Sequence, residues 1–229
     1  MTKRHPALAL TLLLLIGSCG DDDGGGGGSG ATIATADYLA FRDQAVACDG
    51  DAPDPAREMS FTQPDDLDLG ETITATLTTS CGDITIELLT DVAPATVNSF
   101  VFLAEHGYFD GTVSHRVYPG FVVQMGDPTA TGGGGPGYRI PDELPTGDFT
   151  YLAGIVAMAN SGANTGGSQF FIMLADVPLP LNYSVFGFVT SGFEVLERIG
   201  DIPIGADPGT GEPSYPLETL YLETVTIQR

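Results

Sequence analysis

Hydrophobic and polar residues alternate strictly along the stretch that begins near Leu69. This alternation predicts β-strands with one buried face, because successive side chains of a strand point to opposite sides of a sheet. A Cys-Gly-Asp turn at residues 81–83 divides the stretch, so two strands joined as a hairpin are predicted. Their apolar positions are Ile73, Ala75 and Leu77 before the turn, and Ile84, Ile86 and Leu88 after it.

The period changes to that of a helix after Pro94. A proline suits the first turn of a helix, where its missing N–H leaves no bond unmade, and Gly107 supplies the stop. A second helix is predicted over residues 193–199, and a short one within residues 34–47. The apolar side chains on one face of the first helix are Val97, Phe100, Val101 and Ala104.

Six further runs are rich in β-branched and aromatic residues and are separated by Gly/Pro turns, which predicts strands. They are residues 113–117, 121–125, 155–159, 169–174, 185–189 and 220–227. Many short strands with two main helices predict a mainly β fold, in which a barrel closes on itself and the helices cover its ends.

The N-terminus has the pattern of a secretory signal peptide over residues 1–18, with Lys3 and Arg4 ahead of an apolar run. That run is much shorter than the roughly 20 residues of a membrane-spanning helix. The sequence Ile-Gly-Ser-Cys at residues 16–19 resembles the bacterial lipobox, in which the cysteine is acylated and becomes the new N-terminus. Cys19 is therefore predicted to carry a lipid. Ordinary signal cleavage with loss of Cys19 is the alternative.

This pattern divides the chain into three predicted parts. Residues 1–18 are the signal peptide. Residues 19–68 comprise the lipidated cysteine, a tether rich in Gly and Asp, and an extended connector broken by prolines. Residues 69–229 are the globular domain. The tether cannot bury apolar surface, so it holds the domain away from the membrane.

Two cysteines, Cys48 and Cys81, remain if Cys19 is lipidated. An exported chain lies in an oxidising compartment, so a disulfide between them is predicted, and two buried free thiols are the alternative. Only His106 and His115 could join these cysteines in a zinc site, and no ligand pair has the spacing of a metal site. We therefore expect no metal.

The net charge of −22, from 30 acidic and 8 basic residues, repels polyanions and argues against a nucleic-acid partner. Acidity of this kind serves solubility.

The sequence has no Gly-x-Ser-x-Gly elbow, no His-Glu-x-x-His, no Walker loop and no paired Cys-x-x-Cys. The signatures of common hydrolases, metalloproteases and nucleotide-binding proteins are thus missing.

Two long motifs carry the functional signal. Residues 109–127 read Phe-Asp-Gly-Thr-Val-Ser-His-Arg-Val-Tyr-Pro-Gly-Phe-Val-Val-Gln-Met-Gly-Asp, and residues 157–172 read Ala-Met-Ala-Asn-Ser-Gly-Ala-Asn-Thr-Gly-Gly-Ser-Gln-Phe-Phe-Ile. With Val-Phe-Gly at residues 185–187, they make the sequence resemble the cyclophilin family from about Thr72 to Ile227. The resemblance implies a closed eight-stranded antiparallel β-barrel capped by two α-helices, with a proline-binding groove on its outer face. It implies peptidyl-prolyl cis/trans isomerase activity without a cofactor.

The same resemblance implies the site. The arginine of the family's His-Arg-Val segment is its principal catalytic residue and corresponds to Arg116, with Phe121 and Gln124 beside it. Tyr183 stands where many members have a histidine, and the chain has no Trp. The positions that would bind substrate are Val122, Ala159, Asn160, Gln169, Phe171, Leu179 and Tyr183.

These residues also suit the reaction itself. Rotation about an X-Pro amide breaks no bond, so a catalyst needs only a site that binds the twisted amide better than either planar form. Twisting gives the prolyl nitrogen a lone pair, to which Arg116 can donate a hydrogen bond. An apolar slot of Phe121, Phe171 and Leu179 would hold the pyrrolidine ring. Gln124 and the backbone around Asn160 would hold the flanking peptide.

We therefore expect an isomerase that accelerates folding of exported proteins by acting on their proline-containing segments. It would be extracytoplasmic, lipid-anchored to a bacterial membrane, in contact with that membrane only through its N-terminal lipid, and monomeric. A module of the same fold that binds proline segments with little turnover is the alternative. A hydrolase using Ser161 or Ser168 is disfavoured, because the motif contains no oriented base.

Overall fold

The computed structural model describes residues 30–70 and 72–229. The predicted signal peptide, Cys19 and the Gly-rich tether up to residue 29 lie outside the described residues. Within the described chain, no helix has the length and apolar character needed to cross a membrane.

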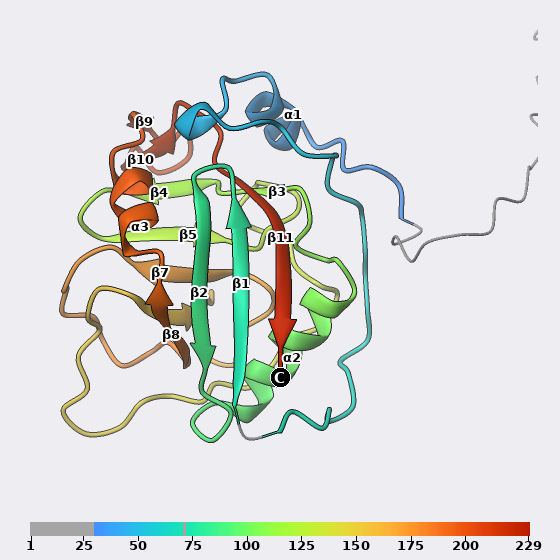
Figure 1. Ribbon diagram of the computed structural model, residues 1–229, viewed down its shortest axis with the longest axis vertical. Coiled ribbons are helices and arrows are strands. Elements are labelled where there is room, and N and C mark those ends of the chain that lie inside the picture. Colours follow the sequence, from blue (N-terminus) through green and yellow to red (C-terminus); the bar gives the residue numbers. More distant parts are fainter. Residues whose placement is uncertain (1–29, 71) are drawn as a thin grey trace, which may run out of the picture.

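Nine strands of the described chain form one antiparallel sheet in the order β3-β11-β1-β2-β8-β6-β7-β5-β4 (Figure 1). In Figure 1, β2, β1 and β11 stand upright at the front and β4, β5 and β7 cross behind them, so the sheet curls round on itself. The strands are β1 (Ile73–Thr79), β2 (Gly82–Leu88), β3 (Thr112–Val113), β4 (Arg116–Tyr118), β5 (Val122–Met125), β6 (Ile155–Met158), β7 (Phe170–Met173), β8 (Val185–Ser191) and β11 (Tyr221–Gln228).

The two end strands, β3 and β4, belong to one extended segment and are separated only by Ser114 and His115. The Ser114 amide donates to the Leu220 carbonyl beside β11 at 2.9 Å, and its hydroxyl donates to the Gln124 carbonyl in β5 at 2.9 Å. The segment therefore joins both ends of the sheet. If β3 and β4 are counted as one strand, the sheet closes into a barrel of eight strands. The predicted mainly β fold class is confirmed.

The first hairpin shows why alternation predicted these strands. In β1 the residues alternate between buried and half-buried, and Ile73, Ala75 and Leu77 are fully buried. Thr79 pairs with Gly82, so the turn consists of Ser80 and Cys81 and begins one residue before its predicted position. Gly82, at φ +121°, begins the second strand in a conformation that disfavours a side chain.

Helix α2 (Pro94–Glu105) begins at the predicted proline and buries Val97, Phe100, Val101 and Ala104. Its first turn is capped from a distant loop, because the Glu143 carboxylate accepts from the Ala95 and Thr96 amides at 2.9 Å each. Helix α3 (Phe193–Gly200) agrees with the predicted second helix within a residue. These two helices lie against the barrel on different sides (Figure 1).

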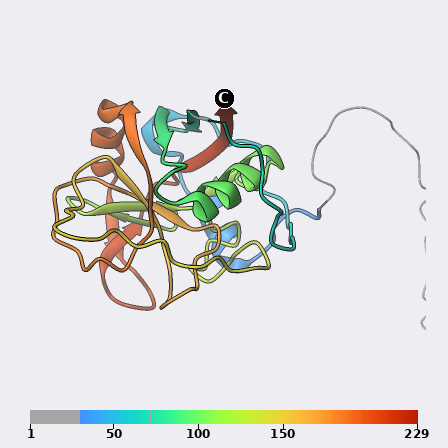
Figure 2. The same ribbon diagram turned by 90° about the horizontal axis from the view of Figure 1, so that it is seen from below.

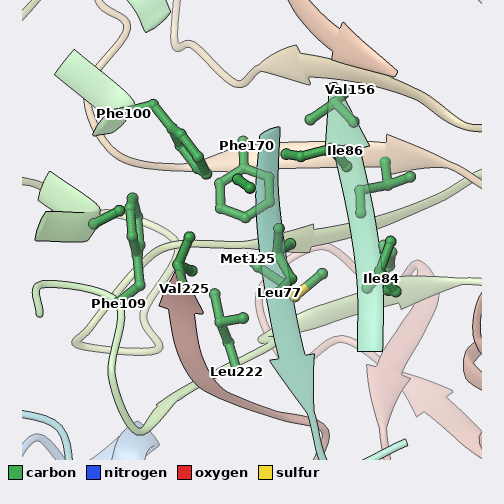
Figure 3. Close-up of a cluster of buried hydrophobic side chains, with 14 of the residues drawn as sticks. Leu77, Ile84, Ile86, Phe100, Phe109, Met125, Val156, Phe170, Leu222 and Val225 are labelled. Atoms are coloured by element: carbon green, nitrogen blue, oxygen red, sulfur yellow. The ribbon is translucent and has the colours of Figure 1, made fainter. Parts of the chain in front are cut away.

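The barrel interior is filled by closely packed, buried side chains. Phe100 of α2, Phe109 and Phe170 of β7 pack against one another, with pairs of ring centroids 5.2–5.9 Å apart (Figure 3). Aliphatic side chains from the hairpin and from β11 close around them, including Leu77, Ile86 and Leu222. A binding site must therefore use the outer face of the sheet.

The connector before the barrel is an ordered part of the structure. It contains α1 (Ala36–Arg42) and a short 3-10 turn, Ala47–Asp49. Tyr38 of α1 is fully buried, and its hydroxyl donates to the Gly111 carbonyl at 2.8 Å. Further along, the connector runs beside α2 (Figure 2), where the Leu67 amide donates to the Asn98 side chain at 2.7 Å.

A disulfide joins the connector to the first hairpin. Cys48 and Cys81 are bonded, with their Cα atoms 5.1 Å apart, and they stand 33 positions apart in the sequence. Within residues 30–70 and 72–229, no group of acidic, histidine or cysteine side chains could hold a metal ion.

A small hairpin near the C-terminus was not predicted. Strands β9 (Ile204–Ala206) and β10 (Pro213–Pro216) pair as a two-stranded sheet that packs against β4. The hairpin lies at the same end of the barrel as α1 (Figure 1).

Candidate active site

Three neighbouring strands, β4, β5 and β7, place the predicted site residues in a row. Arg116 pairs with Gln124, and Gln124 pairs with Phe171. Paired residues share a face of the sheet, so these three side chains project from the same side. Their neighbours Val123 and Ile172 belong to the interior core, which leaves the row on the outer face.

A cavity of about 160 Å³ opens on this outer face. Nine of the ten residues predicted as catalytic or substrate-binding line it, and their individual roles stay predictions. The lining residues are Arg116, Phe121, Val122, Gln124, Ala159, Asn160, Phe171, Leu179 and Tyr183.

The tenth residue, Gln169, does not line this cavity but is hydrogen-bonded to Gln124, which does. Gln124 Nε2 donates to Gln169 Oε1 at 2.9 Å, and Gln169 Nε2 donates to the Gly132 and Gly134 carbonyls at 3.0 and 2.9 Å. Gln169 lines a second, adjoining cavity of about 260 Å³, which shares Gln124 and Asn160 with the first. Ala159 also lines both cavities, so the two lie side by side on the outer face.

The floor of the first cavity is aromatic. Phe171 is only 5% exposed and meets the Tyr183 ring edge to face at 5.2 Å. The segment carrying Tyr183 is held from beneath, because the Tyr151 hydroxyl donates to the Tyr183 carbonyl at 3.0 Å. Leu179 packs on the same outer cluster. The result is a small apolar slot of the kind that can hold a saturated ring.

Arg116 stands at the edge of this slot. Its Cζ lies 5.6 Å from the centroid of the Phe121 ring and 5.9 Å from that of Tyr118, within range of cation–π attraction. Its Nη2 forms an ion pair of 2.9 Å with Glu212 Oε2, and the two side chains are 24% and 44% exposed. The guanidinium is thus paired but reachable by solvent, and it faces the aromatic slot.

The polar side of the cavity comes from the loop after β6. Asn160 Nδ2 donates to the Asn182 carbonyl at 2.8 Å, which ties that loop to the one carrying Tyr183. The Ala159 amide donates to the Gln169 carbonyl at 2.9 Å. These bonds fix the backbone on the side of the cavity opposite Arg116.

His115 precedes Arg116 but does not line the cavity. Burial lowers its pKa, and the Arg116 charge lowers it further, whereas Asp127 and Asp207 act in the opposite direction. Its Nδ1 is buried without a hydrogen-bond partner in the described chain. The imidazole is therefore kept neutral and outside the cavity.

Two residues at the site escaped prediction. Tyr118 adds a second aromatic ring beside the guanidinium, and its place in the motif, two residues after Arg116, could have suggested this. Glu212 comes from the unpredicted hairpin, 96 positions from Arg116, and no sequence signal connects them.

Comparisons with known proteins agree with this geometry. Residues 74–220 match the family model described as cyclophilin type peptidyl-prolyl cis-trans isomerase/CLD. Peptidyl-prolyl cis-trans isomerase ppi1 of Schizosaccharomyces pombe is 47% identical over 150 residues, which cover 64% of this chain and 97% of that protein. Peptidyl-prolyl cis-trans isomerase-like 3 of Rattus norvegicus is 39% identical over 160 residues, covering 68% and 96%.

Solved structures give the same result. The crystal structure of a cyclophilin type peptidyl-prolyl cis-trans isomerase from Cryptosporidium parvum superposes with a TM-score of 0.63 at 32% identity, covering 69% of this chain and 99% of that one. A second structure of that protein, in the presence of the dipeptide Ala-Pro, gives a TM-score of 0.61, also at 32% identity, covering 68% and 99%.

Proposed function

Because the chain belongs to the cyclophilin family and is a peptidyl-prolyl cis-trans isomerase, we propose that it rotates X-Pro bonds in the cavity on the outer face of β4, β5 and β7. Arg116, Phe121 and Gln124 are the proposed catalytic residues. The observation that carries this proposal is the position of the Arg116 guanidinium, 5.6 Å from the Phe121 ring at the edge of an apolar slot.

The reaction needs stabilisation of one geometry only. The X-Pro bond has partial double-bond character, with a barrier of about 18–20 kcal/mol, so unaided rotation takes on the order of 10–100 s. At the top of the barrier the amide is twisted and the prolyl nitrogen carries a lone pair. A planar amide offers no such acceptor, so a donor aimed at that nitrogen favours the transition state over both ground states.

Arg116 would supply that donor. A guanidinium stays charged at every physiological pH, and one preorganised donor is worth roughly a hundred- to a thousandfold in rate. Phe121, Phe171 and Leu179 would hold the pyrrolidine ring while the acyl side rotates. Gln124, with the backbone at Asn160, would hold the flanking peptide and so define the axis of rotation.

The substrate-binding residues are proposed on the same basis. Val122 and Ala159 line the apolar part of the cavity, and Tyr183 closes it beside Phe171. Gln169 supports the site from the adjoining cavity through Gln124. Proline-containing peptide segments are the proposed ligands.

The cellular setting is a further part of the proposal. The signal-like residues 1–18 and the lipobox ending at Cys19 favour an exported bacterial lipoprotein, which is extracytoplasmic and monomeric and aids folding of exported proteins. The relatives named above are eukaryotic, so this setting rests on this chain alone. The Cys48–Cys81 disulfide supports an oxidising compartment. Residues 69–229 form the proposed catalytic domain.

An isomerase assay tests the mechanism. We expect the wild-type chain to accelerate isomerisation of a short Xaa-Pro peptide, and Arg116→Ala to lower kcat/KM about a hundredfold or more while the fold is retained by circular dichroism. Equal rates for the two proteins would reject the role of Arg116. Tight peptide binding without turnover in the wild type would favour the binding module instead.

Mass spectrometry of the N-terminal peptide from membrane extracts tests the anchor. A diacylated or triacylated Cys19 is expected. An unmodified N-terminus elsewhere in the chain would reject the lipoprotein assignment.

A further inference from the structure

The carboxylate of Glu212 holds one edge of the Arg116 guanidinium. Glu212 Oε2 accepts from Nη2 at 2.9 Å and from Nε at 3.3 Å, so two nitrogens of the planar group point at a single oxygen. Within residues 30–70 and 72–229, the guanidinium donates its hydrogen bonds from Nε and Nη2, both to Glu212, and none from Nη1. The contact therefore occupies one edge of the guanidinium and leaves the opposite end available to a ligand.

The guanidinium is also bounded by aromatic rings. Tyr118 and Phe121 lie within 6 Å of Cζ, and these two rings meet edge to face at 5.6 Å. An arginine side chain has many rotamers and loses considerable entropy when it is ordered. Two rings together with a carboxylate restrict it to few of them. Of these three groups, Glu212 is the one that accepts hydrogen bonds from the guanidinium nitrogens in the described chain.

Glu212 can do this because its own backbone is fixed. Its carbonyl accepts from the Asp207 and Ser214 amides at 2.7 and 2.9 Å, and its amide donates to Thr210 Oγ1 at 3.2 Å. The Asp207 carboxylate in turn accepts from the Gly209 and Thr210 amides at 3.0 and 2.7 Å. The turn between β9 and β10 is thus held by its own hydrogen bonds, and the carboxylate projects from a rigid support.

The connector holds this hairpin against the barrel. The rings of Phe41 in α1 and Tyr215 in β10 stack at 5.0 Å with an interplanar angle of 24°. The Thr219 hydroxyl, just after the hairpin, donates to the Phe41 carbonyl, and the Gln44 side chain reaches the Tyr215 hydroxyl at 3.5 Å. A chain of contacts therefore leads from α1 through β10 to Arg116.

We propose that Glu212 is a positioning residue for the isomerase reaction, which holds Arg116 at the mouth of the proline cavity with its Nη1 end directed to the substrate. This inference rests on the proposed function of Arg116. The residue acts through Arg116 and touches no substrate. The hairpin between β9 and β10 thereby becomes part of the catalytic apparatus.

Steady-state kinetics on two variants test the proposal. Glu212→Ala removes the acceptor and is expected to lower kcat about tenfold, with little change in KM, because the slot that binds the ring is untouched. Glu212→Gln keeps an acceptor oxygen without the charge, so its kcat should lie between those of Glu212→Ala and the wild type. Glu197→Gln, which removes the same charge from an exposed position on α3, is the matched control and should retain wild-type kinetics.

The salt dependence of kcat is a second test, because a purely structural role of Glu212 would not make kcat depend on salt. The ion pair is partly exposed, so about 1 M NaCl should screen it and lower wild-type kcat toward that of Glu212→Ala, while the Ala variant responds little. In the double variant Arg116→Ala/Glu212→Ala, removal of Glu212 should cause no loss beyond that of Arg116→Ala.

The outcomes separate this inference from the proposed function. If Arg116→Ala is inactive and Glu212→Ala matches or exceeds wild type, the positioning role is overturned and the catalytic role of Arg116 remains. If Arg116→Ala is fully active, the proposed function itself fails. Should Glu212→Ala not fold, the isosteric Glu212→Gln with the salt titration decides, and wild-type kcat with unchanged salt dependence would overturn the role.

Discussion

Gln124 and Gln169 are joined side chain to side chain, with Gln124 Nε2 donating to Gln169 Oε1 at 2.9 Å. The bond spans the two cavities of the outer face, because Gln124 lines both and Gln169 lines only the second. Gln169 Nε2 continues the network to the carbonyls of Gly132 and Gly134. The orientation of a proposed catalytic side chain therefore depends on the Gly-rich loop.

Replacing Gln169 should disturb this network without touching the proline slot. Gln169→Ala removes the acceptor for Gln124 and both donors to the loop, so kcat/KM is expected to fall about tenfold, the equivalent of one or two ordinary hydrogen bonds. Hydrogen exchange at residues 132–135 should speed up in parallel. Gln228→Ala, on an exposed part of β11, is the control; a wild-type rate for Gln169→Ala would show that the network plays no part.

Tyr183 provides a test of the aromatic slot. Its ring meets Phe171 edge to face at 5.2 Å, and such pairs contribute about 0.5–1.5 kcal/mol beyond area burial. Tyr183→Ala should therefore raise KM for a proline peptide about three- to tenfold and leave kcat largely intact. Tyr183→Phe keeps the ring, so its KM should rise much less. An equal rise in KM for Phe and Ala would mean that the hydroxyl, which both variants lack, holds the substrate and the ring does not.

The barrel was predictable because its strands have one buried face. In β1 and β2 every second side chain enters the interior, so the apolar positions of the sequence and of the structure coincide. Helix α2 was predictable for a similar reason, since Pro94 and Gly107 bound an apolar face that packs on the barrel. The turn between β1 and β2 was misplaced by one residue, because Gly82 and Asp83 are typical of turns but both lie in β2.

The hairpin of β9 and β10 was not predictable from its pattern. Pro213 and Pro216 lie in β10, and its partner strand is only three residues long, so neither shows alternation. Its stability comes from contacts with distant parts of the chain, such as the stacking of Tyr215 on Phe41. Glu212 could not be found by sequence reasoning for the same reason.

The site itself followed from two continuous motifs. Arg116, Gln124 and Phe171 belong to three strands that pair in register, so side chains far apart in sequence arrive in one row. The motifs, together with Leu179 and Tyr183 further along the chain, predicted which residues gather, and the cavity brings nine of the ten together. What each residue does in the reaction is left to experiment.

Removing the disulfide should destabilise the protein. Cys48 and Cys81 are 33 positions apart, for which the chain-entropy model gives a loss of about 3–4 kcal/mol in the free energy of unfolding. Urea denaturation of Cys48→Ser/Cys81→Ser measures it. A reducing agent should lower the stability of the wild type by a similar amount and leave the double variant unchanged. Equal stability of all four samples would mean that the bond does not form in solution.

His115 should make stability depend on pH below neutrality. Its pKa in the folded chain is lowered, first by burial and then by the neighbouring Arg116 charge, although the carboxylates of Asp127 and Asp207 oppose this. Below the ordinary value of 6.5 the unfolded chain takes up a proton that the folded chain resists, so unfolding becomes more favourable. The stability that neutral His115 contributes is thus fully present above pH 6.5 and is lost as the pH falls below that value.

The comparison that checks this uses His115→Gln, which cannot titrate, against the wild type. Free energies of unfolding in urea between about pH 8 and pH 5 should run parallel above about pH 6.5 and diverge below it, with the wild type losing more. His106→Gln, which removes an exposed imidazole, should follow the wild type throughout. If the His115→Gln curve also stays parallel to the wild type down to pH 5, the buried imidazole takes up a proton in the folded chain as readily as in the unfolded one, and its surroundings do not disfavour the charge.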